Sequence, residues 1–470
     1  MRKYFIIGLA GFICLFFDNC STKKQISNNM YQWNIGSPDS INVTATLKGS
    51  HLIIKGKGNM KNNYSNFITG KSEGWVNEIK KVKKVTIKRG VTNIGREIFV
   101  ECDSLTSVSI PNTVKQIGDI AFNKCNNLIS LKIPNSATKI DGYAFAECKN
   151  LKTINIPKKL TRIENYSYGL TGISNITIPS KVTVIGKYAF VGCNNLASII
   201  IPKNVIEVEE GSFSACNSLT DIQLSNNLQS IGKEAFARCN NLSKIFIPSS
   251  ITNIDISAFY YCENFTEINV DTANIKYCSK EGTLYNKAED TLLIVPSGKK
   301  GVFIIPNHAT CIGIGAFEGC SKLTNIVIPN NVTSIGNGAF FRCSSLKEIV
   351  IPNTVDAIEN NTFFYCTSLQ SVVLSKNIVK IGSWSFLNCY NLTSIVIPKK
   401  VLSIGSMAFR DCQGLVSINN LSEIPQDISK DVFDNLNLGK IKLYVPANSI
   451  HAYQNAKVWQ DFGEILPLLE

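Results

Sequence analysis

The sequence of 470 residues predicts a β-rich, right-handed solenoid, and two regularities predict it. A phenylalanine followed three residues later by a cysteine recurs along most of the chain, and successive copies are usually 23 residues apart. An Ile-x-Ile-Pro segment follows most copies, and its alternation predicts a short strand that the proline ends. The phenylalanines are Phe99, Phe122, Phe145, Phe190, Phe213, Phe236, Phe259, Phe317, Phe340, Phe363, Phe386 and Phe409.

Each 23-residue unit is expected to form one coil of the solenoid, with one face buried. A Val-x-x-Ile-Gly segment predicts a second short strand, and its glycine suggests a positive φ. That conformation is not strictly required, because other coils have a carboxylate in this position, at Asp141, Glu164, Glu209, Asp255 and Glu359. No coil buries its apolar face alone, so stability requires that about thirteen of them stack. In one coil, the residues expected to point inward are Val114, Ile117, Ala121, Phe122, Cys125, Leu128, Leu131 and Ile133.

The segments before, between and after the repeats divide the chain. Residues 1–20 resemble a lipoprotein-type signal: Arg2 and Lys3 precede an apolar run, and Cys20 follows it as the residue to be acylated. Cleavage without lipid and an uncleaved anchor are the alternatives. We expect an N-terminal linker and β cap at 21–90, repeats at 91–270, a hairpin insert at 271–304, further repeats at 305–420 and a C-terminal cap at 421–470.

The repeat A-F-x-x-C-x-x-L-x-x-I-x-I-P-x-x-V-x-x-I-G resembles the leucine-rich repeats of the BspA type, which occur in surface proteins of host-associated bacteria and some protozoan parasites. The insert "GTLYNKAEDTLLIVPSGKK" and the ending "LYVPANSIHAYQNAKVWQDFGEILP" also resemble parts of that family. The resemblance implies a leucine-rich repeat solenoid that acts as a surface adhesin or interaction scaffold.

The repeated cysteines are interpreted as a core column, together with Phe122 and Phe145. Stacked coils hold neighbouring Cβ atoms about 4.8 Å apart, whereas a disulfide needs about 3.8 Å, and zinc needs a tetrahedral cluster rather than a line. A disulfide or metal staircase is the alternative. Cys278 and Cys311 lie outside the column and could pair in an oxidising compartment. The column includes Cys125, Cys148, Cys239, Cys343 and Cys366.

Catalysis is not predicted. Histidine occurs only at positions 51, 308 and 451, and the sequence contains no metalloprotease, nucleophile-elbow or phosphate-loop motif. We therefore expect no enzyme activity, no cofactor and no metal. The net charge of +13 permits acidic partners, but the export signal argues against nucleic acid.

Three surface columns are candidate binding sites. The outward position of the strand becomes valine in four successive coils after the insert, at Val327, Val350, Val373 and Val396; β-propensity is the plainer explanation. An aromatic column contains Tyr260, Phe341 and Phe364, with Tyr261 and Tyr365 beside it; partial burial is its plainer explanation. Lysines follow the strand proline, including Lys158, Lys159, Lys399 and Lys400, where a solvated face is the alternative.

The sequence thus predicts a non-enzymatic, exported, lipid-anchored protein of the outer membrane that faces the surface or the periplasm. Its expected partner is a protein or a glycan, with host extracellular matrix among the candidates, and its membrane contact is the lipid anchor alone. The alternatives are a periplasmic structural scaffold, which the basic "CSTKKQ" segment favours, and a glycan-binding module.

Overall fold

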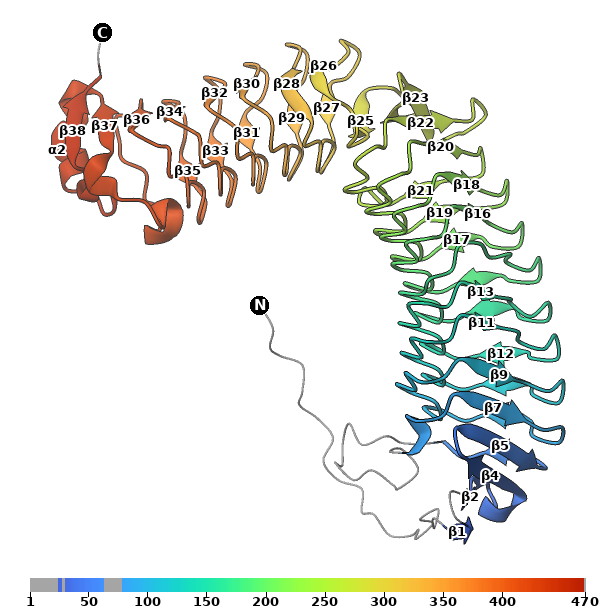
Figure 1. Ribbon diagram of the computed structural model, residues 1–470. Coiled ribbons are helices and arrows are strands. Elements are labelled where there is room, and N and C mark those ends of the chain that lie inside the picture. The colour runs from blue at the N-terminus through green and yellow to red at the C-terminus, as the bar shows by residue number, and fades with distance from the viewer. Residues whose placement is uncertain (1–23, 28–29, 63–77, 469–470) are drawn as a thin grey trace.

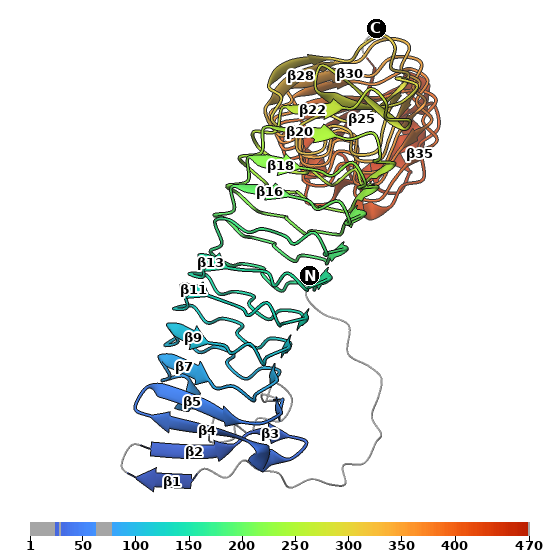
Figure 2. The same cartoon turned by 90° about the vertical axis from the view of Figure 1, so that its right-hand side faces the viewer.

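The computed structural model describes residues 24–27, 30–62 and 78–468, and these residues form a curved stack of coils. Figure 1 shows a first limb that rises from the N-terminal strands, a bend near β23, and a second limb that ends at α2. Figure 2 shows the first limb as a regular staircase of coils. The predicted β solenoid is confirmed. The expected signal segment at residues 1–20, with Cys20, lies outside the described residues.

An antiparallel meander begins the fold and passes into the parallel stack. In its six-stranded sheet, of order β1-β2-β4-β5-β7-β9, the pairs from β1 to β5 are antiparallel and the later pairs are parallel. These first elements are β1 (Lys24–Ser27), β2 (Met30–Asn34), β3 (Gly36–Ser37), η1 (Ser40–Asn42), β4 (Val43–Lys48), β5 (His51–Gly56), β6 (Asn59–Met60), β7 (Lys84–Ile87) and β9 (Ser107–Ser109).

The coils of the first limb form two ladders of strands. The strands that end near the proline position make the main ladder, in which the degenerate coil has no strand, and the strands before the glycine position make the short ladder. The main ladder contains β11 (Ser130–Leu131), β13 (Thr153–Ile154), β16 (Ser198–Ile200), β18 (Asp221–Gln223), β20 (Lys244–Ile247) and β22 (Glu267–Val270). The short ladder contains β8 (Asn93–Ile94), β10 (Gln116–Ile117), β12 (Lys139–Ile140), β14 (Arg162–Ile163), β15 (Val184–Ile185), β17 (Glu207–Val208), β19 (Ser230–Ile231) and β21 (Asn253–Ile254).

The second limb repeats both ladders, with the main ladder on the outer side of the arc and the short ladder on the inner side (Figure 1). Its main ladder contains β26 (Gly301–Ile304), β28 (Leu323–Val327), β30 (Glu348–Val350), β32 (Ser371–Val373), β34 (Ser394–Ile397) and β36 (Ser417–Asn420). Its short ladder contains β27 (Cys311–Ile312), β29 (Ser334–Ile335), β31 (Ala357–Ile358), β33 (Lys380–Ile381) and β35 (Ser403–Ile404).

The insert and the C-terminal end have their own elements. The insert is a three-stranded antiparallel unit, in which β24 pairs with both neighbours; it comprises β23 (Tyr277–Lys280), β24 (Thr283–Asn286) and β25 (Thr291–Ile294). At the C-terminus, β37 and β38 extend the main ladder and α2 packs beside β38. This end comprises η2 (Lys430–Phe433), η3 (Leu438–Lys440), β37 (Lys442–Val445), η4 (Ala447–Ser449), α2 (Ile450–Gln454), η5 (Trp459–Asp461) and β38 (Glu464–Pro467).

Repeated phenylalanines form a continuous stack inside each limb. Neighbouring ring centroids are 5.0–5.9 Å apart from Phe99 to Phe259 and 5.2–5.6 Å apart from Phe317 to Phe433. Such offset pairs stabilise beyond the area they bury. At the insert the stack is interrupted, because Phe317 meets Phe303 edge-on instead. The buried apolar residues accordingly fall into two clusters, one for each limb.

The glycine after the short strand does not have the positive φ that its position suggested. Positive φ occurs instead two residues before and two residues after the laddered phenylalanine, as at Ile120 and Lys124 around Phe122. At Gly118 close packing leaves no room for a side chain, since a Cβ there would lie 2.6 Å from the backbone nitrogen of Arg96, in the preceding coil. The paired left-handed residues turn backbone N–H groups toward the next coil, as in the 2.8 Å bond from the Phe122 N–H to the Ala144 carbonyl.

One coil departs from the repeat but keeps the core continuous. Tyr168 takes the phenylalanine position and stacks on Phe145 and Phe190. Thr171 takes the cysteine position, which the sequence alone places near Leu170, and its hydroxyl lies 3.3 Å from the Cys193 thiol. The missing residue of this coil therefore lies after Thr171, in the segment where the main ladder has no strand between β13 and β16.

Candidate binding surfaces

The column of cysteines is a buried structural feature. Apart from Cys102, whose thiol lies against the Val100 carbonyl of its own coil, each laddered thiol donates a hydrogen bond to a carbonyl of the preceding coil, as in the 3.3 Å bond from Cys239 Sγ to the Phe213 oxygen. Burial raises the pKa of Cys239 and Cys343 well above the ordinary value, so their thiols stay neutral. The same bond is made by Cys125, Cys148, Cys216, Cys262, Cys343, Cys366, Cys389 and Cys412. A buried neutral thiol is a poor nucleophile and metal ligand.

The structure does not bring together Cys278 and Cys311, the two cysteines that could have paired. Both residues are free thiols. Cys278 lies on β23 and Cys311 on β27, in a sheet of order β23-β24-β25-β27-β29. Two strands therefore separate them, which places their Cα atoms about 14 Å apart at ordinary strand spacing, far beyond the reach of a disulfide. The Cys278 thiol instead donates to the Asn286 carbonyl at 3.1 Å.

Chemistry-bearing side chains do not gather in the described chain. Within residues 24–27, 30–62 and 78–468, no group of three or more His, Cys, Asp or Glu side chains could hold a metal ion. His51 lies on β5, His308 packs against the ring of Tyr285, and His451 lies in α2. Over the same residues, no helix has both the length and the apolar character needed to cross a bilayer.

The four predicted valines form a continuous exposed strip on the outer side of the second limb. In-register pairing aligns Val350 with Val373 on β30 and β32, and Val327 lies on the neighbouring strand β28. Ile304 on β26 pairs with Val327 and extends the strip, a member that sequence reasoning missed because the insert breaks the repeat. The exposed fractions of Ile304, Val327, Val350, Val373 and Val396 range from 42% to 68%. We call these five residues the apolar strip.

The corresponding position in the first limb is mixed. Ile200 and Phe246 are exposed there, but polar residues lie on the strands between and beside them, with Gln223 on β18 and Asn269 on β22. Apolar residues therefore line up on consecutive coils only after the insert.

The aromatic column gathers at the bend. Tyr261, from the last coil of the first limb, donates from its hydroxyl to Glu318 Oε1 at 2.9 Å, across 57 residues of sequence. Burial raises the pKa of Glu318, while the hydrogen bonds from Tyr261 and Tyr260 oppose that rise. The ring of Phe364 lies 4.7 Å from that of Tyr365.

Phe341 joins this group, with its ring centroid 5.0 Å from that of Phe364. All four predicted aromatic residues, Tyr260, Phe341, Phe364 and Tyr365, are partly buried. The structure therefore brings them together at the bend, together with Tyr261, which the sequence placed beside the column.

The lysine column is exposed but partly neutralised. Lys158 and Lys159 are exposed in the turn that follows β13. Lys399 forms a 2.6 Å ion pair with Glu423, which lowers the pKa of that carboxyl, and Lys400 donates to the Asn377 side chain at 2.8 Å. The basic edge is therefore weaker at the C-terminal end than the sequence suggested.

A stack of three tyrosines on the first limb was not predicted. The rings of Tyr143 and Tyr166 are 4.7 Å apart and those of Tyr166 and Tyr188 are 4.8 Å apart. All three have left-handed backbones, with φ of 55–56°. The sequence contains a signal for this stack, because tyrosine occurs two residues before the phenylalanine position in three successive coils. Their ring faces cover one another, which leaves mainly edges and hydroxyls exposed.

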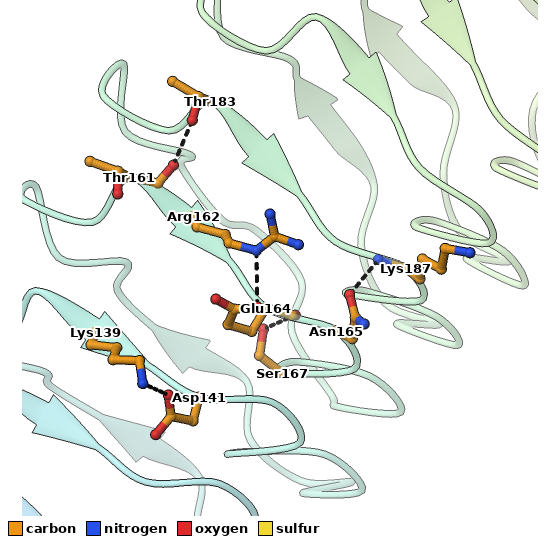
Figure 3. A network of polar contacts seen from close by, with 9 residues as sticks. All are labelled: Lys139, Asp141, Thr161, Arg162, Glu164, Asn165, Ser167, Thr183 and Lys187. Atoms are coloured by element: carbon orange, nitrogen blue, oxygen red, sulfur yellow. Dashed lines mark hydrogen bonds and ion pairs between the residues drawn. The ribbon is translucent and has the colours of Figure 1, made fainter.

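Carboxylates replace the repeat glycine in the same region. Figure 3 shows Asp141 paired with Lys139 at 2.8 Å and Glu164 paired with Arg162 at 3.0 Å, each within one coil. The neighbouring hydroxyl of Ser167 donates to the Glu164 carbonyl at 2.8 Å. Ion pairs this exposed contribute little to stability, so they keep the surface polar rather than form a reactive site.

A stack of coils with a repeated buried core and variable surface columns defines a repeat solenoid, a class that generally serves in binding. The sequence matches the BspA type leucine rich repeat region, in six copies, over residues 76–197, 184–286, 301–416 and 379–457. These matches cover more than half of the chain, and the protein belongs to this family.

Several solved structures are similar to this chain. A leucine rich cell surface protein from Faecalibacterium prausnitzii is 25% identical, with a TM-score of 0.50, and the match covers 85% of this chain and 94% of that one. A leucine-rich repeat protein from Bacteroides ovatus is 22% identical, with a TM-score of 0.48 and coverages of 90% and 98%. The pneumococcal vaccine antigen PcpA is 17% identical, with a TM-score of 0.49 and coverages of 96% and 99%. No curated protein matches.

Proposed function

We propose that this protein is a non-enzymatic adhesion protein of the cell envelope, which binds a protein ligand through the second limb. The apolar strip carries the proposal, since it is an aligned apolar feature that the core does not need. The similarity to a cell surface protein from Faecalibacterium prausnitzii supports an exported location. The lipid anchor at Cys20 and an extracellular matrix ligand belong to the same proposal.

The apolar strip has the properties of a recognition surface. Its five residues span about 19 Å at ordinary strand spacing, which suits one extended segment or one edge of a partner. A polar groove lies on the same ladder, lined by Asn325, Glu348, Ser371 and their neighbours. An apolar line beside polar groups that can fix orientation is the usual composition of a binding interface. Burying the exposed part of each valine would contribute on the order of 1 kcal/mol.

The second candidate is a glycan-binding module, and the aromatic residues at the bend favour it. Phe341, Phe364 and Tyr365 lie within ring-contact distance of one another on successive coils. Partly exposed rings are suited to the apolar faces of sugars as well as to proteins. A structural scaffold in the periplasm would need neither the apolar strip nor these rings to be accessible.

Protease treatment of intact cells tests the surface location. We expect external protease to cleave the chain while a periplasmic marker protein in the same cells remains intact. Cells with a permeabilised outer membrane provide the control for intrinsic susceptibility. A chain that survives in intact cells and is cleaved only after permeabilisation would contradict adhesion and leave the periplasmic scaffold.

A further inference from the structure

A pocket of about 360 Å³ opens beside the bend, between the two limbs. Tyr261 reaches it from the first limb, Ser297 from the end of the insert, and Arg342 and Tyr365 from the second limb. It is separate from the apolar strip, which lies on the main ladder. A cavity of this size is large enough for a small ligand.

Arg342 is the charged centre of the pocket. Its guanidinium carbon lies 5.3 Å from the ring centroid of Tyr261 and 5.4 Å from those of Tyr365 and Phe341. Such rings hold a guanidinium through its faces and leave the N–H groups along its edge available. Within the described chain, Arg342 forms no ion pair.

The nearest acidic partner of the cluster is already engaged. Glu318 accepts the hydrogen bond from Tyr261 and stays outside ion-pair distance of Arg342. Glu263 also lines the pocket, and Lys322 donates to its backbone carbonyl at 2.7 Å, so that the ammonium of Lys322 offsets the carboxylate charge of Glu263. The guanidinium N–H groups of Arg342 therefore have no carboxylate within ion-pair distance among the described residues, which favours an anionic ligand.

Glycines make room for the tyrosines that cross from one limb to the other. A Cβ on Gly319, where φ is +75°, would lie 3.1 Å from Tyr261 Cδ1. A Cβ on Gly315 would clash with the hydroxyl of Tyr260. In the first limb the equivalent positions hold residues with side chains in several coils: Ile120 corresponds to Gly315, and Lys124 corresponds to Gly319. The two glycines thus position the aromatic wall of the pocket.

Short hydroxyl side chains form the floor. The residue after the laddered cysteine is Ser321, Ser344 and Thr367 in three successive coils of the second limb. In the first limb this position often holds asparagine, as at Asn126 and Asn217, whose amides bond to the coil before. Serine and threonine leave space that the longer amides would fill. The hydroxyls of Ser321 and Ser344 make no hydrogen bond to other described residues, so both remain available to a ligand.

We propose that this pocket binds a sugar residue that carries a carboxylate. Arg342 takes the carboxylate through two parallel N–H bonds, the serine and threonine hydroxyls bond to the sugar hydroxyls, and the Tyr261 and Tyr365 rings contact the apolar face. A neutral sugar would leave Arg342 without an acceptor, and a peptide carboxylate would leave the row of hydroxyls unused. This site is independent of the protein-binding surface proposed above, and either one can fail alone.

Calorimetric titration of the full chain with glucuronic acid and N-acetylneuraminic acid tests the proposal. We expect glucuronic acid to bind with a Kd on the order of 1 mM, the affinity typical of a ligand with so few atoms. Glucose and acetate are the controls for ring and charge, and neither should bind measurably. Sialyllactose and a hyaluronan tetrasaccharide then distinguish a terminal acidic sugar from an internal one, and binding of either supports the site.

Variants of two arginines make the test specific. Arg342→Gln should weaken acidic-sugar binding by at least about tenfold, because a charged hydrogen-bond pair is lost, and Arg342→Lys should restore only part of it, since lysine lacks the fork. Arg238→Gln is the matched control. Arg238 belongs to the first limb, its guanidinium carbon lies 5.6 Å from the ring centroid of Tyr261, and it does not line the pocket. The proposal would be overturned if glucose, or a peptide with a free C-terminal carboxylate, bound as tightly as the acidic sugars. It would also be overturned if the Arg342→Gln variant bound the acidic sugars as tightly as the unaltered chain, or if neither acid bound.

Discussion

The two limbs have the same interior and different surfaces. Phe213 and Phe363 occupy equivalent places in the two ring stacks, each fully buried between neighbours 5.2–5.6 Å away. On the main ladder, however, the first limb alternates polar and apolar residues, while the second presents the apolar strip. The first limb carries the tyrosine stack, and the second carries the aromatic residues and arginine at the bend. Positions that repeat therefore build the scaffold, and positions that change between limbs are candidates for recognition.

Loss of one ring from each stack gives the largest expected effect. Phe213→Ala and Phe363→Ala should each cost about 3–5 kcal/mol, because each leaves a cavity in a packed core. Since the buried residues form two clusters divided at the insert, hydrogen exchange measured by mass spectrometry should show lost protection mainly in the mutated limb. Equal loss of protection in both limbs for either variant would mean that the solenoid unfolds as one unit and that the insert does not divide the core.

In the degenerate coil, a substitution is expected to increase stability, by less than the phenylalanine substitutions reduce it. The Tyr168 hydroxyl is buried and has no hydrogen-bond partner among the described residues. Tyr168→Phe should therefore raise the free energy of unfolding by about 1 kcal/mol, since the other coils have phenylalanine in this position. Urea unfolding followed by circular dichroism measures the change.

A second buried tyrosine is the matched control. Tyr453 donates to the Ser422 carbonyl at 3.0 Å, so Tyr453→Phe should lower stability by about as much. If Tyr168→Phe destabilises the chain to the same extent as Tyr453→Phe, the hydroxyl of Tyr168 has a partner and the coil is better adapted than its contacts indicate.

The sequence predicted the repeated interior well, because each buried column requires the same type of residue at the same position of every coil. Phe122, Cys125 and Leu131 are all buried, and the outward Lys132 is exposed. The phase of the repeat was also enough to identify the four valines of the strip. It could not place the left-handed residues, since Ile120 and Lys124 have no residue type that marks a positive φ.

The repeat period could not predict which residues touch across the insert. Ile304 joins the apolar strip through β26, and Tyr261 meets Glu318 only because the insert bends the stack there. The sequence could not decide whether Cys278 and Cys311 are close enough to pair for the same reason, because the order of strands in the insert determines which residues are neighbours. The pocket around Arg342 combines residues from both limbs, so no single repeat contains its pattern.

The central claim is that the second limb, through the apolar strip, makes the protein contact. The most direct test replaces Val327, Val350, Val373 and Val396 by threonine, which keeps size and β-propensity but adds hydroxyls, and measures binding of the purified chain to immobilised matrix proteins such as fibronectin, laminin and collagen. The matched control replaces Ile200 and Phe246 of the first limb by threonine.

We predict that the unaltered chain binds at least one of these proteins and that the four-valine variant binds it at least about 30-fold more weakly, a change of about 2 kcal/mol. The first-limb control should bind as the unaltered chain does. Absence of binding to every matrix protein, or equal weakening by the two sets of substitutions, would contradict the account.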